Sequence, residues 1–229
     1  IVVPEDAPYR LPDTVSLDDA VSLPNLQLAL ALMKMAAPAH TEHSHVLITG
    51  ASGGVAGMLC QVAKLNGFST IGTSRSRDKC QFAIAQGFDH IICTDEEVLK
   101  DRIEQLTQGR GLSFVFDHLG GQSLIDGLKS LAPLGTLVSY NIVQGSPTED
   151  TFQVMRQLLE RSLSIRCFSM HTFDADRQLR RGLMSSAIDL LSQGKVIFPQ
   201  PQIFKLSEVQ QTHALLDQGL VSGKLVMHP

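Results

Sequence analysis

The chain has 229 residues, enough for one large domain or for one domain with part of a second. Hydrophobic residues make up 43% and charged residues 18%, which predicts a packed core and excludes an intrinsically disordered chain. The 19 Lys and Arg stand against 23 Asp and Glu, a net charge of −4. This balance argues against nucleic acid or an anionic membrane as a partner, because both attract basic proteins.

Neither a membrane anchor nor a targeting segment is visible in the sequence. No apolar run reaches the ~20 residues that a membrane-spanning helix needs. No basic start is followed by an apolar stretch and a small-residue cleavage site. We therefore expect a cytoplasmic protein.

The cysteines are Cys60, Cys80, Cys93 and Cys167, and none lies within four residues of another. This spacing provides neither a zinc ribbon nor a neighbouring pair of thiolates. We expect a reducing compartment and no metal site. Cys60 and Cys167 lie in apolar runs and are expected in the core.

Secondary structure is predicted from apolar spacing and from breakers. Residues 1–24 are rich in proline and are predicted to be extended segments with turns, followed by a helix over 25–37 and a polar connector over 38–45. Strands are then predicted at 45–49, 69–73, 90–93, 113–117, 136–140 and 163–170, and helices at 53–66, 77–86, 96–107, 121–130 and 149–161. The remainder is predicted as a helix over 174–192, an extended stretch at 199–204, a helix over 207–217 and a strand at 224–229.

The predicted strands are almost continuously apolar, which is typical of parallel strands covered on both faces. Strands and helices alternate regularly at this spacing, so the sequence predicts an α/β fold with a Rossmann-like doubly wound parallel sheet. Asp95 is the expected N-cap of the helix over 96–107.

A glycine-rich turn, Gly50-Ala51-Ser52-Gly53-Gly54-Val55-Ala56-Gly57, follows the first of these strands and leads into a helix. Small residues let the backbone approach a pyrophosphate, and the helix N-terminus offers free N–H groups and the positive end of its dipole. Ala51 and Ala56 stand where the strict pattern has glycine. The alternative is a tight turn without a ligand. The strand–turn–helix context favours a nucleotide site.

The residues after the second strand of this unit indicate which nucleotide is bound. An NAD-binding protein would usually place Asp or Glu at this strand end, but the sequence continues Ser74-Arg75-Ser76-Arg77-Asp78-Lys79. Arg and Ser are suited to holding a phosphate, which favours NADPH. The alternative is a solvated basic start of a helix, and that is opposed by the helix dipole.

Two other nucleotide folds are excluded by missing residues. Short-chain dehydrogenases need a Tyr with a Lys four residues later, whereas Tyr9 and Tyr140 are followed at that spacing by Asp13 and Gln144. A kinase-type phosphate loop needs Gly-Lys-Ser/Thr at its end, which this turn lacks.

The motifs resemble the medium-chain dehydrogenases/reductases, above all their zinc-free quinone oxidoreductase and enoyl reductase branch. The resemblance rests on "VLITGASGGVAGMLCQVAKLNGFSTIGTSRSRDK", "LTQGRGLSFVFDHLGG", "LKSLAPLGTLVSY" and "HALLDQGLVSGKLVMHP". It implies three parts: residues 1–23 as the end of a GroES-like catalytic domain, 24–172 as an NADP-binding Rossmann domain, and 173–229 as a segment returning to the catalytic domain. Most of that catalytic domain would precede Ile1.

The resemblance also implies a reaction, namely hydride transfer from NADPH to a quinone or to an activated C=C bond, as in an enone or enoyl thioester, without zinc. It further implies a homodimer paired through the strand at 163–170. The family pattern maps the following residues onto the cofactor: Ser52, Gly53, Gly54 and Val55 on the pyrophosphate, Ser74, Arg75 and Lys79 on the 2′-phosphate, His118 and Leu119 near the ribose, and Tyr140, Asn141 and Ile142 near the nicotinamide. No catalytic residue is assigned.

Three departures from the family pattern leave alternatives open. Ala29 stands near a position that is often Thr, Thr94 where many members have Tyr, and Leu220 near a frequent Arg. Each change removes a potential cofactor contact. One alternative is therefore a non-catalytic nucleotide-binding module. The other is an enoyl reductase domain of a polyketide or fatty acid synthase.

Overall fold

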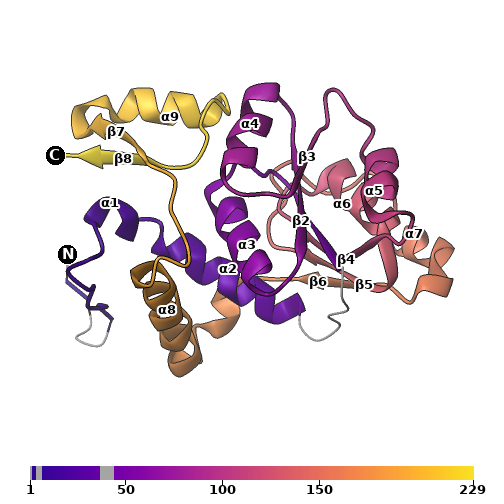
Figure 1. Ribbon diagram of the computed structural model, residues 1–229, viewed down its shortest axis with the longest axis horizontal. Coiled ribbons are helices and arrows are strands. Elements are labelled where there is room, and N and C mark those ends of the chain that lie inside the picture. Colours follow the sequence, from indigo (N-terminus) through magenta and orange to yellow (C-terminus); the bar gives the residue numbers. More distant parts are fainter. Residues whose placement is uncertain (1, 4–6, 37–43) are drawn as a thin grey trace.

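The computed structural model describes residues 2–3, 7–36 and 44–229. Six parallel strands form one twisted sheet in the order β3-β2-β1-β4-β5-β6 (Figure 1). The strands are β1 His45–Ile48, β2 Ser69–Ser74, β3 His90–Cys93, β4 Leu112–Asp117, β5 Leu131–Ser139 and β6 Ser164–Cys167. This order confirms the predicted Rossmann-like fold, in which the direction of winding reverses between β1 and β4.

Helices cover both faces of the sheet because successive residues of each strand point to opposite sides. On one face α2 Leu23–Ala36, α3 Gly54–Leu65, α4 Arg77–Ala85 and α8 Arg177–Ser192 enclose a core that contains Ile48 and Phe116. On the other face α5 Leu99–Thr107, α6 Gly121–Lys129 and α7 Thr151–Gln157 enclose a second core that contains Leu47 and Val115. Burial on both sides explains the continuous apolar character of the central strands.

The N-terminal and C-terminal segments lie together at one end of the molecule (Figure 1). They contain α1 Leu17–Ala20, β7 Gln202–Lys205, the 3-10 helix η3 Leu206–Glu208, α9 Val209–Asp217 and β8 Leu225–His228. β7 and β8 form a separate parallel pair. Lys224 Nζ donates to the Val21 carbonyl at 2.7 Å, and His228 Nε2 lies 2.9 Å from Asp18 Oδ1. The division at residues 23 and 172, and the GroES-like origin of these segments, stay predictions.

Several predicted boundaries were wrong. The helix expected at 96–107 begins only at Leu99, and its N-cap is Val98 rather than Asp95. The backbone N–H groups of Glu96 and Glu97 donate to the Cys93 carbonyl, so these residues form a turn that closes β3. The fifth strand begins at Leu131 instead of 136, because Leu131 pairs with Leu112 before the register of β4 and β5 shifts.

Shorter elements replace two other predicted segments. The helix expected at 149–161 is α7 followed by the 3-10 helix η1 Leu159–Arg161, and the strand expected at 163–170 ends at Cys167. A 3-10 helix η2, Met170–Phe173, follows that strand. Most of the polar connector at 38–45 lies outside the described residues.

The cysteine prediction also needs a correction. Cys80 in α4 and Cys93 at the end of β3 form a disulfide, although 13 positions separate them in sequence. Spacing in the sequence missed this pair because the parallel β2–β3 crossover brings α4 back against β3. Cys60 is buried as predicted, whereas Cys167 is exposed because β6 lies at the edge of the sheet.

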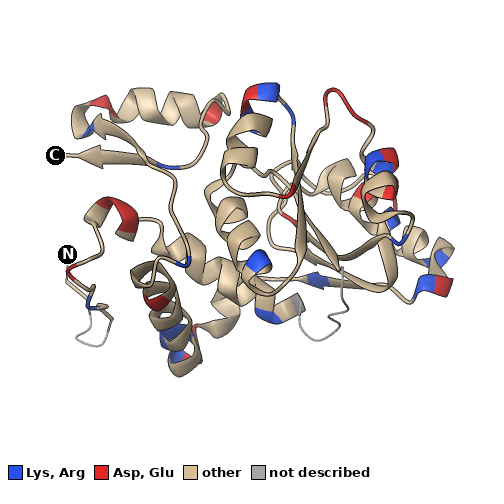
Figure 2. Ribbon diagram, in the orientation of Figure 1, with Lys and Arg blue, Asp and Glu red and all other residues tan. Residues whose placement is uncertain are grey.

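The distribution of charge on the surface agrees with the nearly balanced numbers of basic and acidic residues. Figure 2 shows Lys and Arg interspersed with Asp and Glu along the outer helices, including α5, α7 and α8. No helix in the described part of the chain combines the length and the apolar character needed to span a bilayer.

Candidate cofactor site

A cavity of about 620 Å³ opens at the carboxyl ends of β1, β2 and β4, beside the point where the winding reverses. Ligands of open α/β sheets bind at this place in the fold. The lining residues come from the end of β2, from the loops after the strands and from α4, α5 and α6: Gly50, Ser52, Gly53, Thr73, Ser74, Arg75, Lys79, Thr94, Asp95, Leu99, His118, Leu119, Ser123, Asp126, Val143 and Gln144.

Seven of the twelve predicted cofactor residues line this cavity. They are Ser52, Gly53, Ser74, Arg75, Lys79, His118 and Leu119. The other five lie close by without lining it: Gly54 and Val55 form the first turn of α3, and Tyr140, Asn141 and Ile142 follow β5. The structure therefore brings the predicted segments together, while the role of each residue in binding stays a prediction.

The glycine turn is built as the sequence predicts. Gly50 has a φ of +63°, which favours glycine, and the Gly53 N–H donates to the Gly50 carbonyl at 2.9 Å. The buried Ala51 takes the place of the expected glycine, and its N–H donates to the Thr73 carbonyl at 2.7 Å. A Cβ on Gly72 would lie 2.7 Å from the Ala51 Cβ, so a glycine in β2 makes the room that Ala51 needs.

Three positive groups follow β2, and they differ in their partners. Arg77 pairs with Glu96 at 3.2 Å, and Lys79 Nζ contacts the Gly219 carbonyl. Arg75 is exposed at the cavity and has no hydrogen-bond or ion-pair partner among the described residues. Arg75 is thus the cation that is available to a ligand, beside the buried Ser74.

Asp117 organises the loop after β4. Its buried carboxylate accepts hydrogen bonds from Thr49 Oγ1 at 3.0 Å, Ser123 Oγ at 3.0 Å and the Gly120 N–H at 2.8 Å. Thr49 Oγ1 in turn accepts from the His118 N–H at 3.1 Å. These contacts give Asp117 a structural role at the floor of the site.

His118 is held between backbone and ring contacts. Its Nδ1 lies 3.0 Å from the Thr49 carbonyl, and its ring stacks on Tyr140 with centroids 5.8 Å apart. Burial lowers the pKa of His118, although the charge of Asp117 and the bond to Thr49 act in the opposite direction. Burial also raises the pKa of Tyr140, with Asp117 adding to the effect. Both side chains are therefore neutral near pH 7. With the proton on Nδ1 bonded to Thr49, Nε2 of His118 is a hydrogen-bond acceptor.

The loop after β5 lines the cavity with residues that the prediction did not include. Val143 and Gln144 line the cavity, because their N–H groups donate to the His118 and Leu119 carbonyls at 3.2 and 2.7 Å. Asn141 instead accepts from the Ile142 N–H at 2.9 Å, and both residues are exposed. Nothing in the sequence distinguishes 143–144 from 141–142.

Sequence reasoning missed other residues of the cavity wall. Thr73 and Thr94 lie at the carboxyl ends of β2 and β3, where ligands of such sheets bind. The predicted strand ends would therefore have been enough to identify both residues. The family pattern predicts only a missing tyrosine contact at Thr94, whereas Thr94 Oγ1 donates to the Ser74 carbonyl at 3.3 Å. Ser123 and Asp126 reach the cavity from α6, and no local pattern identifies them.

The C-terminal segment also reaches the glycine turn. The Gly223 N–H donates to the Ser52 carbonyl at 3.1 Å, and Gly53 and Gly223 form an isolated parallel bridge. Among the described residues, no group of three His, Cys, Asp or Glu side chains is arranged to hold a metal ion.

Comparison with known proteins gives concordant matches. Residues 54–192 match the family described as "Zinc-binding dehydrogenase". Quinone oxidoreductase 1 of Escherichia coli strain K12 is 27% identical over 185 residues, covering 80% of this chain. A highly reducing polyketide synthase of Gibberella zeae is 25% identical over 225 residues, covering 95% of this chain but 9% of the synthase.

A solved structure has the same fold as this chain. The crystal structure of Escherichia coli quinone oxidoreductase complexed with NADPH superimposes with a TM-score of 0.86 at 24% identity, covering 96% of this chain and 68% of that one. The chain spans only 56% of the length of quinone oxidoreductase 1.

Proposed function

Because the chain belongs to the zinc-binding dehydrogenase family, in the quinone oxidoreductase branch of the medium-chain dehydrogenases/reductases, we propose that it is the NADPH-binding part of an oxidoreductase. The acceptor that we propose is a quinone or an activated C=C bond, reduced without zinc. The family name does not bear on zinc in this chain.

The observation that carries this proposal is Arg75, which has no partner among the described residues and lines the same cavity as Ser74 and the glycine turn. No acidic residue stands at the end of β2, and Asp78 is already inside α4. A guanidinium at this position suits a 2′-phosphate, whereas the ribose 2′-OH of NADH would call for a carboxylate.

The cavity and its donors fit a dinucleotide. The N-terminus of α3 would hold the pyrophosphate, with its N-cap Gly53 presenting backbone without a side chain to the cavity. Arg75 and Ser74 would hold the 2′-phosphate. When bound, NADPH supplies a hydride from its nicotinamide ring. His118, fixed by Thr49 and Tyr140, would offer Nε2 as an acceptor to a ribose hydroxyl.

A second candidate is an enoyl reductase domain of a polyketide or fatty acid synthase. It is favoured by the match of nearly the whole chain to a segment of a polyketide synthase. The same cofactor site would serve an enoyl thioester. Turnover of a quinone and of an enoyl thioester, compared in the protein at its full natural length, separates the two substrates.

A non-catalytic nucleotide-binding module is the remaining alternative. Ala29 is fully buried in α2 and carries no hydroxyl, and Leu220 is 63% exposed. Turnover of either substrate would exclude this alternative.

The proposed homodimer would pair through β6, which is an edge strand and presents its backbone to a second copy. Sedimentation of the chain tests this: we expect twice the monomer mass.

The proposed cofactor is tested by fluorescence titration of the chain with NADPH and NADH in parallel. We expect NADPH to bind at least about tenfold more tightly, because the 2′-phosphate adds charge-assisted hydrogen bonds. Equal affinity for the two nucleotides would contradict the assignment of NADPH, and binding of neither would contradict the cofactor site itself.

A further inference from the structure

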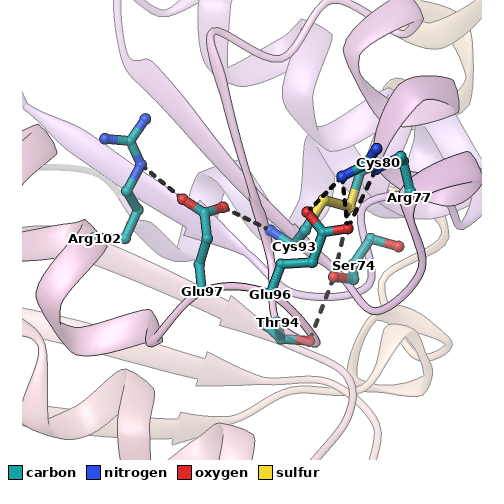
Figure 3. The surroundings of a disulfide bond; sticks show 8 residues. All are labelled: Ser74, Arg77, Cys80, Cys93, Thr94, Glu96, Glu97 and Arg102. Carbon is teal, nitrogen blue, oxygen red and sulfur yellow. Dashed lines mark hydrogen bonds and ion pairs between the residues drawn. A yellow bond between two sulfur atoms is a disulfide. The ribbon is translucent and has the colours of Figure 1, made fainter.

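The Cys80–Cys93 disulfide lies in the wall of the cofactor cavity. It joins α4 to the last residue of β3, with the two Cα atoms 6.1 Å apart. This separation is within the range that disulfides span. Figure 3 shows the bond directly beside Ser74 and Thr94, both of which line the cavity.

Two sequence neighbours of the cysteines line the cavity, and one of them, Lys79, is predicted to contact the 2′-phosphate. Lys79 precedes Cys80, and Thr94 follows Cys93. The Ser74 carbonyl is shared by both sides: Cys80 Sγ lies 3.7 Å away, and the Thr94 N–H donates to it at 2.9 Å. Breaking or forming the bond between the two sulfur atoms therefore acts directly on residues that line the cavity.

The other direct tie between α4 and the loop after β3 is weak. It is the ion pair of Arg77 and Glu96, whose side chains are 73% and 47% exposed. Exposed pairs of this kind contribute little to stability. The loop itself is held elsewhere, by Glu97, which accepts from the Cys93 N–H and pairs with Arg102 (Figure 3). Among the described residues, the disulfide is thus the main link that fixes α4 against this loop.

We propose that Cys80 and Cys93 form a redox modification site that controls the affinity of the cavity for NADPH. This inference rests on the proposed function, because it concerns the same cofactor site. The disulfide holds Ser74, Lys79 and Thr94 in the arrangement that encloses the 2′-phosphate. Two thiols cannot approach as closely as two bonded sulfurs, so reduction separates α4 from the end of β3 and loosens this wall.

The chemistry is thiol–disulfide exchange with a dithiol. The thiolate of the dithiol attacks Cys93, which is partly exposed, while Cys80 is buried. The Cys80–Cys93 bond breaks and a mixed disulfide forms. The second thiol of the reductant then releases Cys93, and two S–H groups result. Two electrons and two protons pass from the dithiol, which becomes a disulfide; a small-molecule disulfide reverses the process.

Thermodynamic linkage adds a reciprocal effect. If the bonded form binds NADPH more tightly by some factor, NADPH shifts the thiol–disulfide equilibrium toward the bonded form by the same factor. Bound NADPH should therefore protect the disulfide from a dithiol.

The experiment compares the 229-residue chain in two redox states. The chain is treated with oxidised or reduced dithiothreitol, and the Cys80–Cys93 linkage is quantified by alkylation and peptide mass spectrometry. Each sample is then titrated with NADPH. We expect the linked peptide only after oxidation, and an affinity at least about fivefold higher in the oxidised chain, the lower end of typical coupling between sites.

Two variants locate the effect. Cys93→Ala should bind NADPH equally in both conditions, and Cys167→Ser, which changes the exposed free cysteine, should keep the wild-type difference. The inference is overturned if no linked peptide forms, or if the linked and reduced chains bind NADPH equally. Failure of the proposed function looks different, since NADPH would then bind in neither state; that outcome overturns the inference as well. The wild-type comparison holds even if a variant does not fold.

Discussion

The ring of His118 occupies the space into which a side chain at position 50 would project. A Cβ built on Gly50 would lie 2.0 Å from the Cε1 atom of His118. The glycine turn and the loop after β4 are therefore packed together, and the absence of a side chain at one position allows the imidazole at the other.

This relationship predicts the effect of Gly50→Ala. The substitution forces the ring of His118 to move and places alanine at a φ of +63°, so we expect a loss of about 1–3 kcal/mol of stability and weaker NADPH binding. Urea unfolding and nucleotide titration measure the two effects. Gly109→Ala is the matched control, because Gly109 has a φ of +76° with open space around it. Equal losses in both variants would mean that the contact with His118 is unimportant.

Arg75 and Arg77 form a second matched pair. Arg75→Ala should weaken NADPH binding about tenfold or more and leave NADH binding unchanged, since hydrogen bonds to a charged phosphate contribute about 1.5–3 kcal/mol. Arg77→Ala should leave both affinities close to wild type, because Arg77 is engaged with Glu96. The assignment of the 2′-phosphate site is wrong if Arg77→Ala has the larger effect.

Asp117 is predicted to stabilise the floor of the site. Asp117→Asn replaces an acceptor of three hydrogen bonds by a group that must turn an N–H toward a donor. We expect a loss of about 1–3 kcal/mol in the free energy of unfolding. Asp189→Asn, on the exposed face of α8, should change stability by less than about 0.5 kcal/mol. Similar values for the two variants would contradict the structural role of Asp117.

The lowered pKa of His118 predicts a pH dependence of stability. Burial is its main cause, so the unfolded chain binds a proton at His118 more readily than the folded chain. The contribution of the neutral His118 is complete above its unfolded pKa of about 6.5 and is lost as the pH falls toward the lowered folded pKa. Urea unfolding between pH 5 and 8 should show a shallower dependence in His118→Asn than in the wild type. Parallel curves would show that His118 does not titrate in this way.

The two free cysteines should differ in reactivity. Burial raises the pKa of Cys60 to about 11, whereas Cys167 is exposed at the sheet edge. Since the thiolate is the reacting form, brief alkylation of the folded chain at pH 8 should modify Cys167 and spare Cys60. Peptide mass spectrometry reports both sites, and denaturant should make Cys60 reactive. Labelling of Cys60 at the rate of Cys167 would contradict its buried position.

Much of the site could be located from the sequence because its signals are local. The glycine turn lies between a strand and a helix, and Ser74 and Arg75 follow the next strand, so their meeting at one sheet edge follows from parallel pairing. Tyr140, Asn141 and Ile142 were instead assigned through the family resemblance, and their role stays a prediction; the residues of this loop that line the cavity are Val143 and Gln144. That difference depends on backbone hydrogen bonds to His118 and Leu119, which no local pattern encodes.

The sequence by itself determined the order of strands and helices, the parallel sheet and the position of the nucleotide turn, because apolar periodicity and turn residues act over a few neighbouring positions. Only the tertiary structure decided which distant groups meet. It joined Cys80 to Cys93, set Lys79 against Gly219 and, within the described part of the chain, gave Arg75 no partner. These contacts depend on how α4 and the C-terminal segment pack around the sheet, and packing is a property of the whole chain rather than of any stretch of it.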